Sequence, residues 1–220
     1  MVQQQRIGDE QQPLVIVDGF SGDAAALRAA AAASAFGPAG QHYPGLRAPL
    51  PPDYMRVQLP RIAGAMGRAF GRFRRLRVVD ASFSIVTTPP GALDVRQRLP
   101  HVDAYGADRI ALVHYLSPAA RDGTAFYRHR STGYETIDAA RAPAFFATLD
   151  RELAECAPPP GYIAGDTDRF ACIGRAEARE DRAILYRSFA LHSGAIAPDA
   201  PLSADPATGR LTVTAFLAME

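Results

Sequence analysis

Beyond residue 76, the chain consists mainly of short runs of β-branched and aromatic residues that are interrupted by Pro, Gly and Asp. Runs of this kind are typical of strands, and their interruptions are typical of turns. We expect strands at residues 77–88, 99–105, 109–117, 122–130, 133–137, 168–175, 182–191 and 209–218. So many short strands bury their faces by packing as two sheets. The pattern therefore predicts an α+β fold whose strands close into a double-stranded β-helix, or jelly roll.

The residues before this region combine a short strand with two helices. Residues 14–17 form a β-type run, and an alanine-rich helix is expected to follow, extending to about Phe36. Ser21 has the residue type of its N-cap, with Asp23 in its first turn. Apolar residues then recur at helical spacing, which predicts a second helix over residues 60–74.

The strands are interrupted once by a helical pattern, at residues 142–156, where one stripe carries Phe and Leu side chains. A chain of 220 residues is of ordinary size for one domain. We therefore expect a single jelly-roll domain, with a flexible polar segment at 1–12, helical support at 13–76 and the β core at 77–220.

Charge and composition exclude several classes of function. The net charge is +1, so no strong field favours nucleic acid or an anionic membrane surface. The sequence shows no apolar signal core and no run of membrane-spanning length, which predicts a cytoplasmic protein. Cys156 and Cys172 are expected to be free thiols rather than a disulfide, and neither has the spacing of a zinc site. All 24 basic residues are Arg, so any anion site must use guanidinium groups.

His101 and Asp103 form a His-x-Asp triplet in one of the expected strands. Residues two apart on a strand share a face, so an imidazole and a carboxylate would lie side by side. His192, at the end of a distant strand, could complete a set of two histidines and one carboxylate, the ligand set of a facial iron(II) site. Such a triplet also occurs by chance, and a buried His192 bonded to backbone is the alternative interpretation.

The last expected strand alternates between an apolar and a polar face. Its polar positions are Arg210, Thr212 and Thr214. If this face points into the β core, Arg210 can bind a carboxylate in a bidentate way, with the Thr212 hydroxyl as a further donor. The alternative is a half-exposed edge strand with Arg210 in water.

Five features in this order resemble the iron(II)/2-oxoglutarate-dependent dioxygenases, especially their prolyl-4-hydroxylase-like branch. They are Leu99–Asp103, Val113–Ser117, Gly123–Tyr127, Ala190–Gly194 and Arg210–Thr212. Two N-terminal features are similar to those of uncharacterised bacterial members, namely Val15–Phe20 and Tyr43–Arg47. Two departures stand out: His192 and Arg210 are 18 positions apart, which suggests an inserted loop, and the usual glycine pair is replaced by Asp122-Gly123.

The resemblance implies a set of site residues and a reaction. It implies iron(II) ligands at His101, Asp103 and His192, and a site for 2-oxoglutarate at Arg210 and Thr212. The oxidant would be dioxygen, and the products would include succinate and carbon dioxide. Three residues near the metal motif or on the adjacent strand are candidates for contact with the substrate, namely Tyr105, Tyr127 and Arg128. The substrate would be a small molecule or a peptide side chain, and the sequence leaves a homodimer open.

Two other functions are compatible with the same scaffold. One is a cupin-like metal enzyme that does not use 2-oxoglutarate, since double-sheet rolls host both kinds of chemistry. The other is a binding protein without catalytic activity. Arg210 discriminates between the oxygenase and the cupin-like enzyme, because only the oxygenase needs this side chain to bind 2-oxoglutarate.

Overall fold

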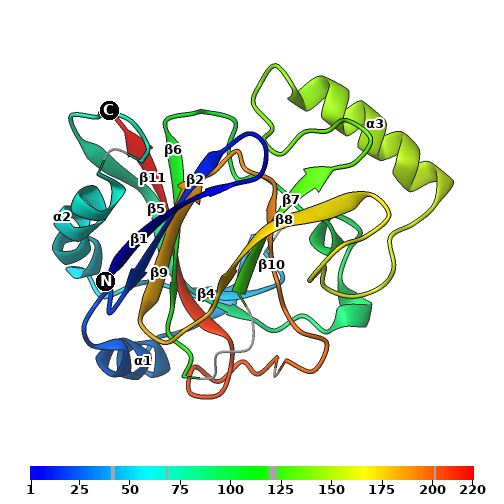
Figure 1. The fold of residues 1–220 in the computed structure, drawn as a ribbon. Helices are drawn as coiled ribbons and strands as arrows, with labels where there is room; N and C mark the ends of the chain where they lie inside the picture. The colour runs from blue at the N-terminus through cyan, green and yellow to red at the C-terminus, as the bar shows by residue number, and fades with distance from the viewer. Residues whose placement is uncertain (41–42, 68, 119–122, 201) are drawn as a thin grey trace.

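The computed structural model describes residues 1–40, 43–67, 69–118, 123–200 and 202–220. Two antiparallel sheets and three α-helices are formed by these residues (Figure 1). The helices are α1 (Ala24–Ala32), α2 (Tyr54–Met66) and α3 (Ala142–Glu155). Two short 3-10 turns, η1 (Pro90–Ala92) and η2 (Arg96–Arg98), precede the His-x-Asp triplet.

The larger sheet has the strand order β1-β2-β9-β6-β11-β5-β4-β3. Its strands are β1 (Val2–Ile7), β2 (Gln12–Asp18), β3 (Gly37–Pro38), β4 (Gly45–Ala48), β5 (Leu76–Val86), β6 (Arg109–Tyr115), β9 (Arg182–Arg187) and β11 (Leu211–Met219). The smaller sheet has the order β10-β7-β8 and consists of β7 (Gly123–His129), β8 (Phe170–Glu177) and β10 (His192–Gly194). Strands distant in sequence thus become neighbours, which places His192 beside the middle of the chain.

The elements form successive layers (Figure 1). Helices α1 and α2 cover one face of the larger sheet, the smaller sheet lies on its other side, and α3 lies beyond the smaller sheet. On β11, Val213 and Ala215 join the apolar core shared with α1 and α2, whereas Thr212 and Thr214 line a cavity on the opposite face. The alternation expected for β11 is therefore present, and its polar face points into the molecule.

Most expected strands are present with slightly different bounds, but two are not. Residues 99–105 form no strand, because Pro100 has no N–H to donate and only His101 makes a ladder pair, with His192. Residues 133–137 contribute one bridge, between Thr136 and Ala190. The expected strand 182–191 ends at Arg187, and β10 begins separately at His192. The first residue of the expected strand 122–130, Asp122, lies outside the described residues.

The helices differ from expectation at their ends. Asp23, not Ser21, is the N-cap of α1, and its side chain accepts a hydrogen bond from the Ala26 N–H at 2.9 Å. The Ser21 N–H and hydroxyl instead donate hydrogen bonds to the Asp181 carboxylate. Helix α2 begins at Tyr54 and ends at Met66, so Pro60 lies inside it and does not start it. Helix α3 agrees with the expected span to within one residue.

The N-terminal residues are ordered into the sheet, contrary to the expected flexible segment at 1–12. Strand β1 pairs with β2 along its whole length, from Val2–Val17 to Ile7–Gln12. Its residues are exposed except for Ile7, which explains why their composition does not indicate a strand. Strands β2 and β4 also belong to the same sheet as β5, β6, β9 and β11, so the larger sheet spans both of the expected subregions.

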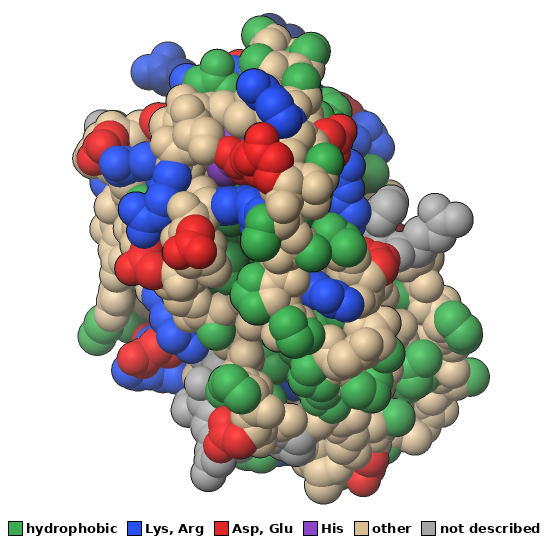
Figure 2. Space-filling model, turned by 90° about the vertical axis from the view of Figure 1, so that its right-hand side faces the viewer, with side chains coloured by type: hydrophobic (Ala, Val, Ile, Leu, Met, Phe, Trp, Pro, Cys, Tyr) green, Lys and Arg blue, Asp and Glu red, His purple; other side chains and the backbone are tan. Residues whose placement is uncertain are grey.

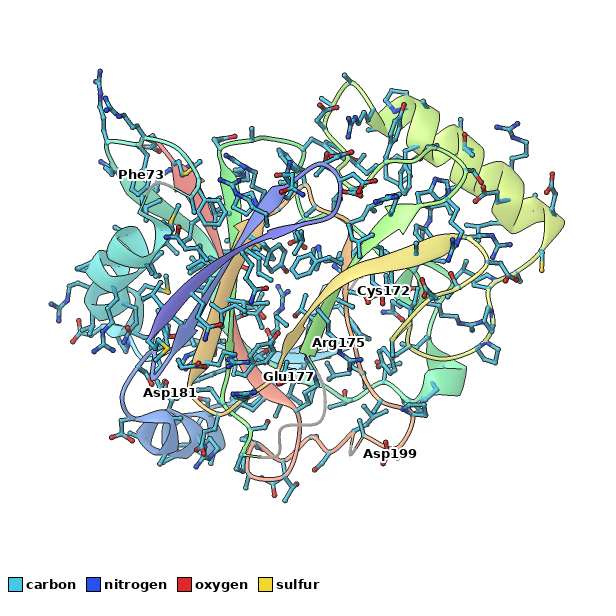
Figure 3. All side chains as sticks on the ribbon, in the orientation of Figure 1. Phe73, Cys172, Arg175, Glu177, Asp181 and Asp199 are labelled. Atoms are coloured by element: carbon cyan, nitrogen blue, oxygen red, sulfur yellow. The ribbon has the colours of Figure 1, made fainter. Side chains whose placement is uncertain are left out.

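Three further features concern the cysteines, the distribution of side chains on the surface and the character of the helices. Cys156 and Cys172 are free thiols, and Cys172 lies on β8 with Arg175 and Glu177 (Figure 3). Acidic and basic side chains are interspersed on the face shown in Figure 2, and hydrophobic side chains gather in its lower part. None of the helices formed by the described residues combines the length and apolar character needed to cross a membrane.

Candidate metal centre

Backbone hydrogen bonds hold the His-x-Asp triplet against the segment that leads into β10. His101 and His192 exchange two of them, with N···O distances of 2.9 and 3.0 Å. The Asp103 N–H donates to the Ser188 carbonyl at 2.8 Å. Leu99 is extended, as the proline after it favours. An extended segment, even without a full strand, is enough to turn His101 and Asp103 to the same side.

The three side chains expected from the sequence meet at one point. His192 Nε2 lies 3.5 Å from Asp103 Oδ2, and His101 Nε2 lies 3.7 Å from Asp103 Oδ1. The two imidazole rings are 4.4 Å apart between centroids. One potential ligand atom from each residue lies within 4.8 Å of the others. Two nitrogen donors and one carboxylate oxygen thus form a cluster that could hold a metal ion.

His192 presents a lone pair toward Asp103. Its Nδ1 lies 2.9 Å from the Ala190 carbonyl oxygen, which can only accept a hydrogen bond. The proton of the neutral ring is therefore on Nδ1, and Nε2 is left as an acceptor or metal ligand. Burial lowers the pKa of His192 to about 4, so the ring is neutral near pH 7. This is the protonation state that metal ligation needs.

Asp103 is in an environment that disfavours its negative charge. Its side chain is 15% exposed, and burial raises its pKa to about 6, although the charges of His101 and Arg47 oppose the shift. A bound cation would add to the favourable charge that His101 and Arg47 already supply to this carboxylate. The donor set therefore fits a divalent metal in both geometry and electrostatics.

A cavity of about 620 Å³ opens over this centre. One side is the polar face of the larger sheet, including Thr212 and Thr214. The opposite side includes Phe145 and Phe146 of α3, the helix that interrupts the strand sequence. Tyr43, in the loop before β4, also lines it. The cavity thus joins the metal centre to both polar and apolar walls.

Arg210 and Thr212 lie on the wall of the same cavity. Arg210 Nη2 donates to the Gly123 carbonyl at 2.9 Å, and the buried Thr212 hydroxyl donates to the Ser84 carbonyl at 3.3 Å. Tyr43 is close enough that the Arg210 and Arg47 guanidiniums oppose the rise in its pKa that burial causes. A guanidinium and hydroxyl groups therefore gather at one end of the cavity.

The three expected substrate contacts have different surroundings. Tyr105 lines the cavity and is 44% exposed. Tyr127 is fully buried among apolar residues, and its hydroxyl accepts a hydrogen bond from Ser193 at 3.2 Å. Arg128 forms ion pairs with Glu135 and Asp9, at 2.7 Å in each case. Neither Tyr127 nor Arg128 is among the described residues that line the cavity, and contact of either with a substrate stays a prediction.

Two cavity residues near the metal centre were not singled out as site residues from the sequence. The Tyr186 ring packs against His192 with centroids 4.7 Å apart, and burial together with the charge of Asp103 raises the pKa of its hydroxyl. Arg47 comes from β4, a strand of four residues. Alternation along β9 could have placed Tyr186 on an inward face, but only the pairing of β4 with β5 brings Arg47 to the cavity.

Comparison with known proteins places the chain in a family. A family model described as "Family of unknown function (DUF6445)" matches residues 1–217. The chain belongs to this family. No curated protein matches this DUF6445 chain in sequence.

Solved structures share the fold of the DUF6445 chain. HygX from Streptomyces hygroscopicus, solved with nickel, 2-oxoglutarate and hygromycin B bound, has a TM-score of 0.54 at 13% identity, over 96% of this chain and 84% of HygX. Two enzymes of nogalamycin biosynthesis each have a TM-score of 0.51 at 16% identity over 96% of this chain. They are the non-heme alpha ketoglutarate dependent epimerase SnoN and carbocyclase SnoK, of which 79% and 81% are covered. These likenesses establish a common two-sheet architecture.

Proposed function

We propose that this DUF6445 chain is an iron(II)- and 2-oxoglutarate-dependent oxygenase with a jelly-roll core that hydroxylates a small molecule or a peptide side chain. The observation that carries the proposal is the convergence of His101, Asp103 and His192 inside a cavity that Arg210 also lines. The shared fold of HygX, SnoN and SnoK supports it.

In this proposal, three side chains that line the cavity would hold the iron. His192 would use Nε2, because Nδ1 is engaged by the Ala190 carbonyl. Asp103 would supply the anionic oxygen, and His101, whose side chain is 55% exposed, would complete the set. When bound, iron(II) and 2-oxoglutarate supply oxidation by dioxygen coupled to release of succinate and carbon dioxide.

The remaining residues orient the ligands and limit access of water. Arg210 would bind the distal carboxylate of 2-oxoglutarate through its planar guanidinium, with the Thr212 hydroxyl as a further donor. The Tyr186 ring packs edge-on against His192 and keeps the imidazole in its orientation. Phe145 and Phe146 present aromatic rings from α3 to the cavity and would exclude water from the substrate.

Metal binding gives the first test. We expect that removal of the Asp103 carboxylate in Asp103→Asn, or of the imidazole in His192→Ala, weakens binding of iron(II) or nickel(II) at least tenfold. Calorimetric titration of the purified, metal-free protein measures this. Asp53→Asn is the matched control, because Asp53 is exposed and, among the described residues, forms its ion pair with Arg56 on α2. Unchanged metal affinity in both site variants would contradict the assignment of the ligands.

Co-substrate binding gives the second test. In nickel-loaded protein, Arg210→Gln should weaken 2-oxoglutarate binding roughly ten- to hundredfold, as loss of a charge-assisted bidentate contact implies. Nickel affinity should be retained, and Arg56→Gln should behave as wild type, because Arg56 is exposed on α2. If the wild type binds nickel but not 2-oxoglutarate, the cupin-like alternative replaces the oxygenase.

A further inference from the structure

A second guanidinium faces the same cavity from β4. Arg47 is paired in register with Ser84 of β5, and Ser84 is paired with Thr212 of β11. Paired residues on neighbouring antiparallel strands point to the same face, so these three side chains form one row across the sheet. With strands ~4.8 Å apart, the backbones at Arg47 and Thr212 are separated by about 10 Å. Arg47 and Thr212 therefore extend toward the cavity from positions two strands apart.

The hydrogen-bonding capacity of Arg47 is only partly used. Its nearest carboxylate is Asp80, at 3.7 Å from Nη1, beyond hydrogen-bonding distance, and the Asp80 side chain is itself 56% exposed. The guanidinium lies over the Tyr43 ring, 5.0 Å from its centroid. Its Nε is buried and has no hydrogen-bond partner among the described residues. Nε lies away from Nη1, on the edge that binds a carboxylate in a bidentate way.

A buried N–H without a hydrogen-bond partner destabilises the folded protein. Because Arg47 lines a ligand-sized cavity, a bound ligand could supply the missing acceptor. Leaving such a group unsatisfied is unfavourable for folding, and more so if the group is charged. Arg47 thus has a side chain whose Nε–H a ligand oxygen could satisfy.

The balance of charge in the cavity favours an anionic ligand beyond 2-oxoglutarate. Three guanidiniums line it, from Arg47, Arg96 and Arg210, whereas Asp103 is the one carboxylate among the described lining residues. Arg96 is paired with Asp150 at 2.8 Å. The proposed function uses Arg210 for 2-oxoglutarate and Asp103 for the metal. Arg47 is used by neither of these assignments, although its charge acts on Asp103.

The rest of the wall is apolar and aromatic. Helix α3 contributes Phe145, Phe146 and Leu149, and the segment around the metal centre contributes Leu99 and Val102. Such a surface accommodates a hydrophobic body, while a single polar group at its edge fixes orientation. A ligand that satisfies both features has one acidic group and an apolar or aromatic remainder.

We propose that Arg47 binds a carboxylate of the primary substrate, so that this chain acts on carboxylic acids with an apolar or aromatic body. The inference rests on the proposed function, because it assigns Arg210 to 2-oxoglutarate and Arg47 to the substrate. Arg47 would be a specificity-determining residue: its planar, bidentate donors select a carboxylate over a neutral amide of the same shape.

The test compares acids with their amides. The probes are 3-phenylpropionate, 4-phenylbutyrate and hexanoate, each with its amide, and ligand-observed NMR measures their binding to protein saturated with nickel(II) and 2-oxoglutarate. We expect wild type to bind at least one acid tenfold or more tightly than its amide. Arg47→Gln should abolish this preference, Arg47→Lys should retain part of it, and Arg56→Gln should retain all of it. Nickel binding should be retained and 2-oxoglutarate affinity unchanged in Arg47→Gln, and its thermal midpoint reports whether it folds.

Several results would overturn the inference. They are equal binding of acid and amide by wild type, binding of none of the acids, or an acid preference that survives in a folded Arg47→Gln variant. Loss of 2-oxoglutarate binding in Arg47→Gln but not in Arg210→Gln would make Arg47 the co-substrate residue instead. If wild type binds neither nickel nor 2-oxoglutarate, the proposed function fails. The same titration in free protein then still shows whether Arg47 selects carboxylates.

Discussion

At the residue scale, Asp181 connects three parts of the chain through one carboxylate. Its Oδ1 accepts hydrogen bonds from the Ser21 N–H and hydroxyl, at 2.8 and 2.6 Å, and its Oδ2 accepts from the Gly22 N–H at 2.8 Å. The same carboxylate lies 2.9 Å from His114 Nε2. These donors hold the pKa of Asp181 well below its usual range despite burial. Asp181 lies beside α1 at one end of the larger sheet (Figure 3), remote from Cys172 on the smaller sheet.

We therefore expect Asp181→Asn to lower the free energy of unfolding by roughly 2–3 kcal/mol, because hydrogen bonds to a charged acceptor are lost and an amide N–H₂ faces other donors. Urea denaturation at pH 7.5 measures this. Asp53→Asn, which neutralises an exposed carboxylate, should change stability by less than about 1 kcal/mol. Equal effects of the two substitutions would show that the Asp181 network contributes little.

Individual site residues differ in how far the sequence predicts them. His101 and Asp103 could be paired because they are two residues apart, and this relation needs only an extended backbone. Arg47 could not be placed, because its position in the cavity depends on the register between β4, β5 and β11. The ion-pair partners of Arg128 could not be predicted for a similar reason: Glu135 and Asp9 come from other segments of the chain. Residue type alone does not reveal such partners.

At the scale of elements, tertiary packing in α2 outweighs the helix-breaking tendency of a proline in its interior. Pro60 lies in the interior of the helix, where it removes a backbone hydrogen bond and crowds the preceding turn. The helix nevertheless begins at Tyr54, whose side chain is buried against the larger sheet and hydrogen-bonded to His114 at 2.8 Å. Burial of Tyr54 one turn and more before the proline explains why the predicted start at residue 60 was wrong.

Pro60→Ala should therefore stabilise the protein. Proline in a helix interior costs about 3 kcal/mol relative to alanine, and the greater entropy of the unfolded chain offsets part of the gain, so we expect an increase of about 1–2 kcal/mol. Pro60 is exposed, so no core contact is lost. Pro52→Ala, which lies before the helix, serves as the control and should be neutral or slightly destabilising. A less stable Pro60→Ala variant would mean that the proline makes a favourable contribution in this helix.

The predicted elements agree best with the structure where a pattern is long or strongly periodic. Helix α3 and strand β11 have near-expected bounds because their apolar residues recur with the period of their own structure. Strand β1 was missed because all but one of its residues are exposed, so it carries no alternation of burial to detect. Its pairing with β2 depends on backbone hydrogen bonds, which leave little trace in residue type.

At the scale of the whole molecule, the strands of the two sheets are interleaved in the sequence, and each sheet contributes differently to the core and the candidate site. The larger sheet forms a core with α1 and α2 on one face, and its other face lines the cavity over the candidate metal centre. The smaller sheet, through β10, brings His192 to the triplet in the loop after η2. A predicted jelly roll anticipates such convergence, but the strand order that produces it is a property of the assembled sheets.

The charge state of His114 makes the folding stability of the whole protein depend on pH. This fully buried ring lies between Tyr54 and Asp181, and burial lowers its pKa below the ordinary value of 6.5 in spite of Asp181. Below pH 6.5 the unfolded chain therefore takes up a proton that the folded protein does not, so folding stability falls as pH decreases. Each such proton contributes up to about 1.4 kcal/mol per pH unit.

In metal-free protein, we expect the free energy of unfolding from urea denaturation to fall less steeply between pH 6.5 and 5 in His114→Gln than in wild type, although the variant is less stable at pH 7.5. Other groups, such as Asp103, titrate in both proteins, so the difference in slope isolates His114. Parallel pH profiles would contradict a neutral, buried imidazole at this position.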